Sequence, residues 1–246
     1  PLVAIASVYL FNCNLKTNQD IATGAIIGSP FMLSCLALFL LGITLIFQKR
    51  KELNLDYKNV IRDYKYFLIG YPIAILASFI NVQIFKYFIV TFLFILYCIF
   101  VYRTIIKSKE CYCSEELDEL IFSKLFSSKK YVLFFIISQM IISISALIIF
   151  SHLFMHEITY FSNVLKISPL ILSLIVTPFA TELPECVNSI LWVKENKDDL
   201  AVANVLGAII FQGMILTSIG ILLTPWQFNQ EIIINSIVAL LSSLIF

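Results

Sequence analysis

The chain has 246 residues, of which 60% are hydrophobic and only 13% are charged. Ordinary soluble domains hold about 45–50% apolar and about 25% charged residues, so this composition excludes them and predicts a polytopic membrane protein. The net charge is +1, and no basic surface interleaved with aromatic residues indicates a nucleic-acid partner.

Apolar runs of about 20 residues can cross about 30 Å of hydrocarbon as helices. The chain begins in a short apolar run (1–12) and stops in another (232–246), and neither is long enough to cross comfortably. We therefore expect a fragment of a longer protein, cut at both ends. Complete or nearly complete spans are predicted between these runs, at 20–47, 66–82, 84–102, 131–151, 167–193 and 199–223.

Lysine and arginine are unevenly distributed between the two sides of this predicted topology. Fourteen of them lie in loops 48–65, 103–130 and 194–198, which share one side, and three lie on the other side. Because cytoplasmic loops carry the excess of basic residues, we expect these three loops in the cytoplasm. We expect the protein to lie in the plasma (cell inner) membrane.

Two polar segments outside the spans carry side chains with possible chemistry. The stretch CYCSEELDEL (111–120) concentrates four acids, for which a solvated amphipathic loop is favoured over a Ca²⁺-sensing segment. His152, His156 and Glu157 are expected in an external loop, where an ordinary interfacial loop is favoured over a metal site.

Two segments of the sequence resemble each other. DIATGAIIGSPF begins at Asp20 and DLAVANVLGAIIF begins at Asp199, and each has a glycine eight residues after the aspartate, Gly28 or Gly207. The polar turns that precede them lie on opposite sides of the predicted membrane, so the copies are inverted. Inverted pairs interrupted by Pro or Gly indicate a secondary transporter whose site lies at the repeat interface. We predict three parts. Residues 1–105 form a first repeat half that is incomplete at its N-terminus, and residues 106–130 form a cytoplasmic linker. Residues 131–246 form a second repeat half that is incomplete at its C-terminus.

The predicted span 167–193 contains the stretch TPFATELPE, whose prolines are unusual inside an apolar helix. A proline lacks an N–H and its ring crowds the carbonyl four residues earlier. Pro184 thus releases the carbonyl of Ala180, and Pro178 releases that of Leu174. We expect this helix to be broken here, because released carbonyls are tolerated in hydrocarbon only when they are buried in protein or line a cavity.

The same stretch carries the Thr181 hydroxyl and the carboxylates of Glu182 and Glu185. These are hard oxygen ligands, which suit Ca²⁺ or Na⁺. A carboxylate inside a bilayer is a functional-site hypothesis by default. The following span adds the polar side chains of Asn204 and Gln212. Its small residues are expected to let it approach the broken helix closely: Gly207, Ala208 and Gly213.

The segment LKISPLILSLIVTPFATELPECVNSILWVKENKDDLAVANVLGAIIF (165–211) resembles the second α-repeat of the sodium/calcium exchanger superfamily of cation/calcium antiporters. DIATGAIIGSPFMLSCLALFLLG (20–42) is similar to the second half of the first repeat. The resemblance implies an all-α, ten-helix antiporter of two inverted five-helix halves, of which about eight segments are present. It also implies export of Ca²⁺ against Na⁺.

The resemblance implies roles for individual residues. Thr181 and Glu185 match the family motif, whereas Glu182 stands where the family usually has Ser and Ala180 where it has Gly. In the first copy, Leu33 stands where the family has a polar ligand. The implied ligands of the transported cation are Glu185, Glu182, Thr181, Ala180, Gln212, Ser29 and Asn204.

The leading hypothesis is a secondary active antiporter that exchanges Ca²⁺ for Na⁺ by alternating access, and not an enzyme. It needs no cofactor besides the transported ions, and its partners are membrane lipid and inorganic cations, with no obligate protein partner. A proton could replace Na⁺, because two nearby carboxylates repel and one then holds its proton more tightly.

Three further alternatives stay open. One is exchange of other cations, and a second is a transport-impaired paralogue, suggested by Leu2 and Leu33 at ligand positions. The remote third is an intramembrane hydrolase, in which the two glutamates and His152 or His156 activate water.

Overall fold

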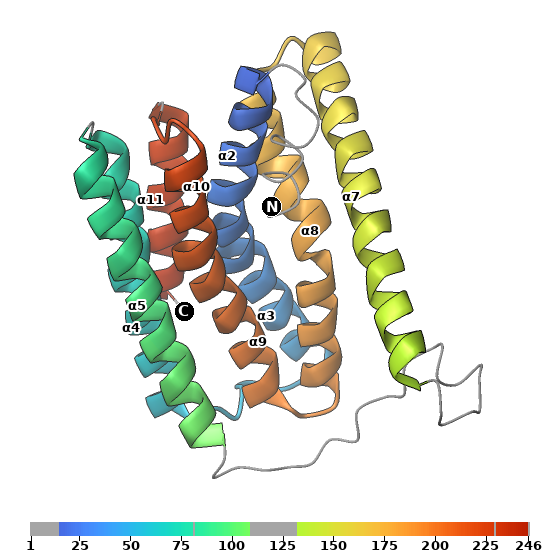
Figure 1. Cartoon of the computed structure of the whole chain (residues 1–246). Helices are drawn as coiled ribbons and strands as arrows, with labels where there is room; N and C mark the ends of the chain where they lie inside the picture. Colours follow the sequence, from blue (N-terminus) through green and yellow to red (C-terminus); the bar gives the residue numbers. More distant parts are fainter. Residues whose placement is uncertain (1–14, 81, 109–131, 229, 246) are drawn as a thin grey trace.

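The computed structural model describes residues 15–80, 82–108, 132–228 and 230–245, and the regular elements of this part are all helical (Figure 1). This confirms the predicted all-α bundle. In chain order the elements are α2 (Leu15–Met32), η1 (Leu33–Ala37), α3 (Leu38–Phe47), α4 (Tyr57–Leu76), η2 (Ala77–Phe79), α5 (Gln83–Ser108), α7 (Val132–Leu165), α8 (Pro169–Lys194), α9 (Asp198–Phe211), η4 (Gln212–Leu216), α10 (Thr217–Leu223) and α11 (Gln230–Ile245).

The described residues include five helical stretches that are long and apolar enough to cross a membrane, so the chain is an integral, multi-pass membrane protein. These stretches are Gln19–Phe47, Gln83–Ile106, Ile136–Leu165, Pro169–Lys194 and Asp198–Leu223. The predicted span 66–82 is not among them, because its helix, α4, is shifted toward the N-terminus. Asp56 starts α4 early, since its side chain accepts a hydrogen bond from the Lys58 N–H at 3.2 Å and so caps the first turn.

Helix α7 extends well beyond its predicted end at residue 151. It continues to Leu165, because its sequence contains no glycine or proline that would end it earlier. His152, His156 and Glu157 therefore lie within a helix, and the expectation of an external loop was wrong. The acidic segment 111–120 lies outside the described residues.

The connections between helices alternate between two ends of the bundle (Figure 1). The α3–α4 and α8–α9 connections lie at one end, together with the end of α5 and the start of α7. The α7–α8 and α10–α11 connections lie at the opposite end. The predicted loops 48–65 and 194–198 thus share an end, as the distribution of basic residues requires.

The two similar segments run in opposite directions, as predicted for inverted copies (Figure 1). Each forms a long helix that is interrupted by one turn of π-helix, η1 in the first copy and η4 in the second. The π-turns begin at Leu33 and Gln212, and each of these residues lies thirteen positions after the aspartate of its own copy (20 to 33 and 199 to 212). Because π-turns are rare and concentrate at functional sites, the shared position supports the alignment of the copies.

Helix α2 packs along α8 with their backbones in direct contact. A Cβ atom at Gly24 would collide with Ser173 and with the Leu170 carbonyl, and one at Gly28 would collide with the Leu174 carbonyl. Small residues four apart permit such close approach of two membrane helices. This contact places the C-terminal part of α2 beside the middle of α8.

Helix α8 is continuous from Pro169 to Lys194, so the predicted break at its prolines was wrong. Pro178 removes one hydrogen bond from the helix, but the carbonyl that it frees, that of Leu174, lies against Gly28 of α2. Neighbouring helices can stabilise a proline-containing membrane helix in this way. The tight packing against α2 thus explains why α8 does not unwind at Pro178.

Replacement of Gly28 by alanine is expected to destabilise the bundle, because the new methyl group has no room beside the Leu174 carbonyl. Overpacking of this kind costs about 1–3 kcal/mol, which corresponds to roughly 2–4 °C per kcal/mol in melting temperature for a protein of this size. Gly42→Ala is the matched control, since its Cβ would meet no described atom within 4 Å. Thermal unfolding of both variants in detergent measures the difference, and equal melting temperatures would contradict the close contact.

Candidate functional site

A buried carboxylate lies in the middle of α8. Glu182 is only 3% exposed, and two neutral side chains donate hydrogen bonds to it. The Thr181 hydroxyl donates to Oε1 at 2.9 Å, and the Gln212 amide donates to Oε2 at 2.6 Å. The Ser29 hydroxyl of α2 lies close to this carboxylate. Three elements, α2, α8 and η4, therefore meet at Glu182.

Several oxygen atoms in this region have no hydrogen-bond donor. Among the described residues, Thr177 Oγ1, Glu185 Oε2 and Gln212 Oε1 are buried and unpartnered. Gln212 contacts Glu182 directly, and Glu185 interacts with it electrostatically. A buried acceptor without a donor is costly, whereas the same oxygen is a suitable ligand for a hard cation. These oxygens could therefore act as ligands for a hard cation.

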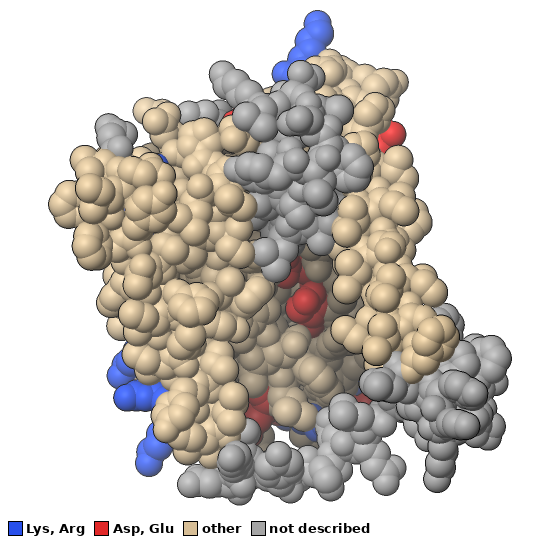
Figure 2. Space-filling model, in the orientation of Figure 1, with Lys and Arg blue, Asp and Glu red and all other residues tan. Residues whose placement is uncertain are grey.

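The cluster is open to one side of the bundle. Figure 2 shows acidic atoms at mid-height, in a hollow between α7 and the body of the bundle. The acidic residues in the middle of α8 are Glu182, which is buried, and Glu185, which is only partly buried. Of the two carboxylates, Glu185 is thus the more exposed and Glu182 the more buried.

Local backbone geometry orients the side chains that α2 and η4 contribute to this cluster. Gln212 is the first residue of η4, and it is 6% exposed. Ser29, which follows Gly28 on the packed face of α2, donates its hydroxyl proton to the Ala25 carbonyl at 2.9 Å. That bond uses the only proton of the hydroxyl, so the lone pairs of its oxygen remain available to a ligand.

The structure brings together four of the predicted ligands, Ser29, Thr181, Glu182 and Gln212, with Glu185 one turn further along α8. It does not bring Asn204 to the carboxylates. The Asn204 amide donates instead to the Glu185 backbone carbonyl at 3.2 Å and to Ser189 Oγ at 3.1 Å. Asn204 therefore fixes the backbone of α8 beside Glu185.

The Ala180 side chain lies on the exposed side of α8, and its role as a ligand stays a prediction. One other expectation differs from the structure. Gly207 was expected to pack closely on α8, but a Cβ atom there would meet no described atom within 4 Å. Gly213 does make a close contact, with Phe67 of α4 and not with α8, because the π-turn directs this part of the chain toward α4.

Thr177 was missed by the sequence analysis. It is 3% exposed and lies four residues before Thr181, and therefore on the same side of α8. That spacing within TPFATELPE was the signal that could have identified it.

Comparison with known proteins finds a similarity to one family. Residues 135–246 match the sequence model of a family described as sodium/calcium exchanger protein. The match covers a little under half of the chain. No curated protein matches the sequence.

A solved structure, described as the crystal structure of the H⁺/Ca²⁺ exchanger CAX, is similar to this chain with a TM-score of 0.67 and 17% sequence identity. The similarity covers 98% of this chain and 61% of that one. At this level of identity it shows a shared fold. The chain spans about three fifths of the length of that exchanger.

The described residues contain no group of three or more His, Cys, Asp or Glu side chains that could hold a metal ion. The histidines considered for an intramembrane hydrolase, His152 and His156, are therefore not gathered with Glu182 and Glu185. The hydrolase alternative has no structural support among these residues.

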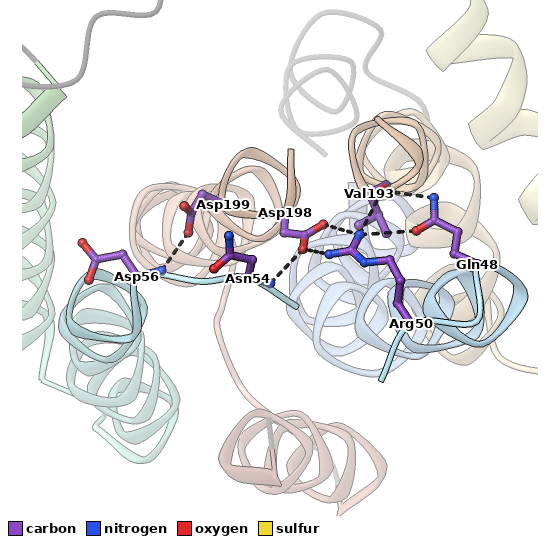
Figure 3. Close-up of polar contacts among 7 residues, drawn as sticks. All are labelled: Gln48, Arg50, Asn54, Asp56, Val193, Asp198 and Asp199. Atoms are coloured by element: carbon purple, nitrogen blue, oxygen red, sulfur yellow. Dashed lines mark hydrogen bonds and ion pairs between the residues drawn. The ribbon is translucent and has the colours of Figure 1, made fainter. Parts of the chain in front are cut away.

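A group of polar contacts joins the α3–α4 connection to the end of α8 and the start of α9 (Figure 3). We call this group the clasp, and the sequence analysis did not predict it. Its residues are Gln48, Arg50, Asn54, Asp56, Val193, Asp198 and Asp199. Arg50, in the connection after α3, forms a bidentate ion pair with Asp198, the first residue of α9. The Asp198 side chain is 1% exposed, and it also accepts a hydrogen bond from the Asn54 N–H at 2.8 Å. The hydrogen bond to Asp198 raises the pKa of Arg50, so this guanidinium stays charged.

The clasp also covers the last turn of α8. The Gln48 side chain donates to the Val193 carbonyl at 3.2 Å, and Arg50 donates to the same carbonyl at 3.4 Å. A second aspartate, Asp199, accepts from the Asp56 N–H at 2.9 Å. Because carbonyls at a helix C-terminus and N–H groups in a loop need partners, these bonds attach the α3–α4 connection of the first repeat to the α8–α9 corner of the second.

Arg50→Ala is expected to lower the melting temperature of the protein, because it leaves the buried Asp198 carboxylate without its counter-charge. The double variant with Asp198→Asn is expected to recover part of the loss, since the unpaired charge is then removed. Lys197→Ala is the control, because its ion pair with Glu195 is solvent-exposed and such pairs contribute little. Thermal unfolding of the set in detergent tests this, and a loss in Lys197→Ala equal to that in Arg50→Ala would contradict a special role for the clasp.

Proposed function

We propose that the protein is a secondary active antiporter that exchanges Ca²⁺ for a monovalent cation, Na⁺ or H⁺. The observation that carries this proposal is Glu182, a buried carboxylate in a membrane-crossing bundle whose partners are neutral and whose surroundings include unpartnered oxygens. Charged groups at this depth are expensive and are typical of ion pathways. The match of residues 135–246 to the sodium/calcium exchanger model supports the same class of function.

In the proposed site the cation is bound by Glu182 and Glu185, with Thr181, Ser29 and Gln212 as neutral oxygen ligands. Thr177, with its buried and unpartnered oxygen, is added to this set. Ca²⁺ takes six to eight oxygen ligands, which this set could approach with backbone carbonyls or water. The Ala180 carbonyl, which Pro184 deprives of its helical hydrogen bond, is a candidate of that kind. Asn204 acts as a positioning residue through its bond to the Glu185 carbonyl.

The coupling ion is proposed as Na⁺ or H⁺, because different observations favour each. The family model is named for sodium and calcium, whereas the solved structure with the similar fold is described as a H⁺/Ca²⁺ exchanger. Both ions can compete with Ca²⁺ for the same carboxylate oxygens. Calcium uptake driven by a Na⁺ gradient at constant pH, or by a pH gradient without Na⁺, distinguishes the two.

Transport is proposed to follow alternating access between two inverted halves, in the plasma membrane and with the basic loops in the cytoplasm. Lipid is the expected neighbour of the exposed apolar faces, and no obligate protein partner is proposed. The alternative of a transport-impaired protein rests on Leu33, a fully buried apolar residue at the position that corresponds to Gln212 in the second copy.

Glu185→Gln in the full-length protein is expected to reduce Ca²⁺ uptake into proteoliposomes strongly. Loss of groups that merely orient metal ligands costs about 10–100-fold, so loss of a ligand carboxylate is expected to cost at least about tenfold. Glu195→Gln is the matched control, because Glu195 lies in the exposed turn after α8 and pairs with Lys197. Uptake driven by an outward Na⁺ or proton gradient is the measurement, with correct folding checked by thermal unfolding.

Two outcomes would count against the proposal. Equal uptake by the Glu185 and Glu195 variants would remove Glu185 from the site. Absence of ion-driven Ca²⁺ flux in the unmodified full-length protein would instead favour the transport-impaired alternative.

A further inference from the structure

Three basic side chains lie together at one end of the neighbouring helices α4 and α5. Lys58 and Lys65 of α4 and Arg103 of α5 are exposed, and none of them forms an ion pair with another described residue. Asp63, which lies between the two lysines in the chain, is paired with Arg62 instead. Figure 2 shows Lys and Arg atoms gathered at this end of the molecule, at the lower left. We call Lys58, Lys65 and Arg103 the basic group.

Each of the two helices carries an exposed apolar stripe that leads to the basic group. Residues three, four or seven apart lie on one face of a helix. On α5 the exposed stripe is Phe88, Phe92, Ile95 and Ile99, and Arg103 follows it. On α4 it is Leu76 and Ile69, and Lys65 and Lys58 follow it. Both helices thus change from apolar to basic on the same face.

A ring contact fixes the register of the two helices. Tyr66 of α4 and Phe100 of α5 meet edge to face, with their ring centroids 5.5 Å apart, and the helices run antiparallel (Figure 1). Lys65 lies one residue from this contact and Arg103 lies three residues from it, toward the same end of the bundle. At a rise of about 1.5 Å per residue, Lys65 and Arg103 therefore lie at nearly the same height.

The two stripes also face the same side of the helix pair. Because successive residues of a helix are rotated by about 100°, Lys65 and Arg103 lie about 100° and about 60° from the ring contact. Both rotations have the same sense along their own chains, and in an antiparallel pair this places the two residues on one side. The opposite side of α4 carries Phe67, which is 0% exposed. Lys65 and Arg103 can therefore reach one group that lies between the helices, on the face turned away from the bundle.

This surface matches the two ends of a phospholipid. The stripes offer apolar contact to acyl chains, and a phosphate accepts strong, charge-assisted hydrogen bonds from Arg and Lys. A zwitterionic headgroup carries a positive charge of its own, whereas an anionic headgroup needs positive charge from a partner. Basic clusters at the end of a membrane helix are typical of binding to anionic lipids.

We propose that the basic group and the two stripes form a binding site for an anionic phospholipid, whose phosphate lies between Lys65 and Arg103. Lys58 lies about two turns further along α4, where it can contact the outer part of the headgroup. The cytoplasmic leaflet holds the anionic lipids, and it is the side proposed above for this end of the bundle. The inference does not depend on transport, because it concerns a surface outside the candidate cation site.

Native mass spectrometry of the full-length protein in detergent measures the binding of single lipids. Phosphatidylglycerol is the anionic probe, phosphatidylcholine with the same acyl chains is the zwitterionic one, and glycerol phosphate supplies a phosphate without acyl chains. Phosphatidylglycerol is expected to bind more tightly than either of the others, because it alone combines net negative charge with acyl chains.

Substitutions in the basic group test its position. Lys65→Gln and Arg103→Gln are each expected to weaken binding of phosphatidylglycerol about fivefold, and the double variant about 25-fold. Arg103→Lys keeps the charge and is expected to keep most of the affinity. Lys194→Gln is the matched control, because it removes one exposed basic residue at the same end of the bundle, on α8. Melting temperatures without added lipid check that each variant is folded.

Four results would overturn the proposal. Equal affinities for phosphatidylglycerol and phosphatidylcholine would remove the charge selectivity, and a loss in Lys194→Gln equal to that in Lys65→Gln would remove the site. Glycerol phosphate that binds as tightly as phosphatidylglycerol would indicate a phosphate site and not a lipid site. Binding that appears only when the four acids of residues 111–120 are neutralised would show that this segment of the chain occupies the basic group.

Discussion

The contact between α2 and α8 is the constraint on which the site depends. Gly24 and Gly28 allow the two helix backbones to touch, and this contact brings Ser29 to the face of α8 that carries Glu182. It also buries the Leu174 carbonyl that Pro178 leaves without a partner. In hydrocarbon there is no water to satisfy such a group, so a larger residue at Gly28 would separate the helices and expose the carbonyl at the same time. The packing of α2 against α8 therefore also determines where the proposed ligands lie.

Polar contacts away from the site hold the rest of the bundle together. The Ser242 hydroxyl of α11 donates to Ser34 Oγ in η1 at 2.9 Å, and the Trp226 indole donates to the Ala74 carbonyl of α4 at 3.0 Å. Hydrogen bonds between membrane helices contribute modestly to stability, about 0.6 kcal/mol on average. These contacts differ from those of the candidate site, because each hydrogen-bond donor in them meets an acceptor. Unpartnered acceptors gather around Glu182, where a cation is proposed to bind.

The sequence was sufficient for the features that depend on composition and spacing. Hydrophobic run lengths predicted five of the six spans, missing only at 66–82, where the helix begins earlier. The Asp-to-Gly spacing predicted the inverted copies, and TPFATELPE led to Glu182, whose ligand role stays a prediction. The continuous path of α8 could not be predicted, because it depends on the packing of Gly28 from a distant segment. The clasp of Arg50 and Asp198 joins residues far apart in the chain, which no local pattern reveals. The part played by Asn204 was also hidden, since the residue type does not say whether it meets an ion or a backbone carbonyl.

The matching π-turns tell something about the history of the chain. A π-turn adds one residue to a helix and rotates every later side chain relative to the earlier ones. The same insertion at the same position in two antiparallel helices is most simply explained by the duplication of one segment. In the second copy the turn still presents a polar residue, Gln212, to the carboxylate. In the first copy it presents Leu33. Leu33 is therefore a position at which protein engineering could give the first repeat a ligand of its own.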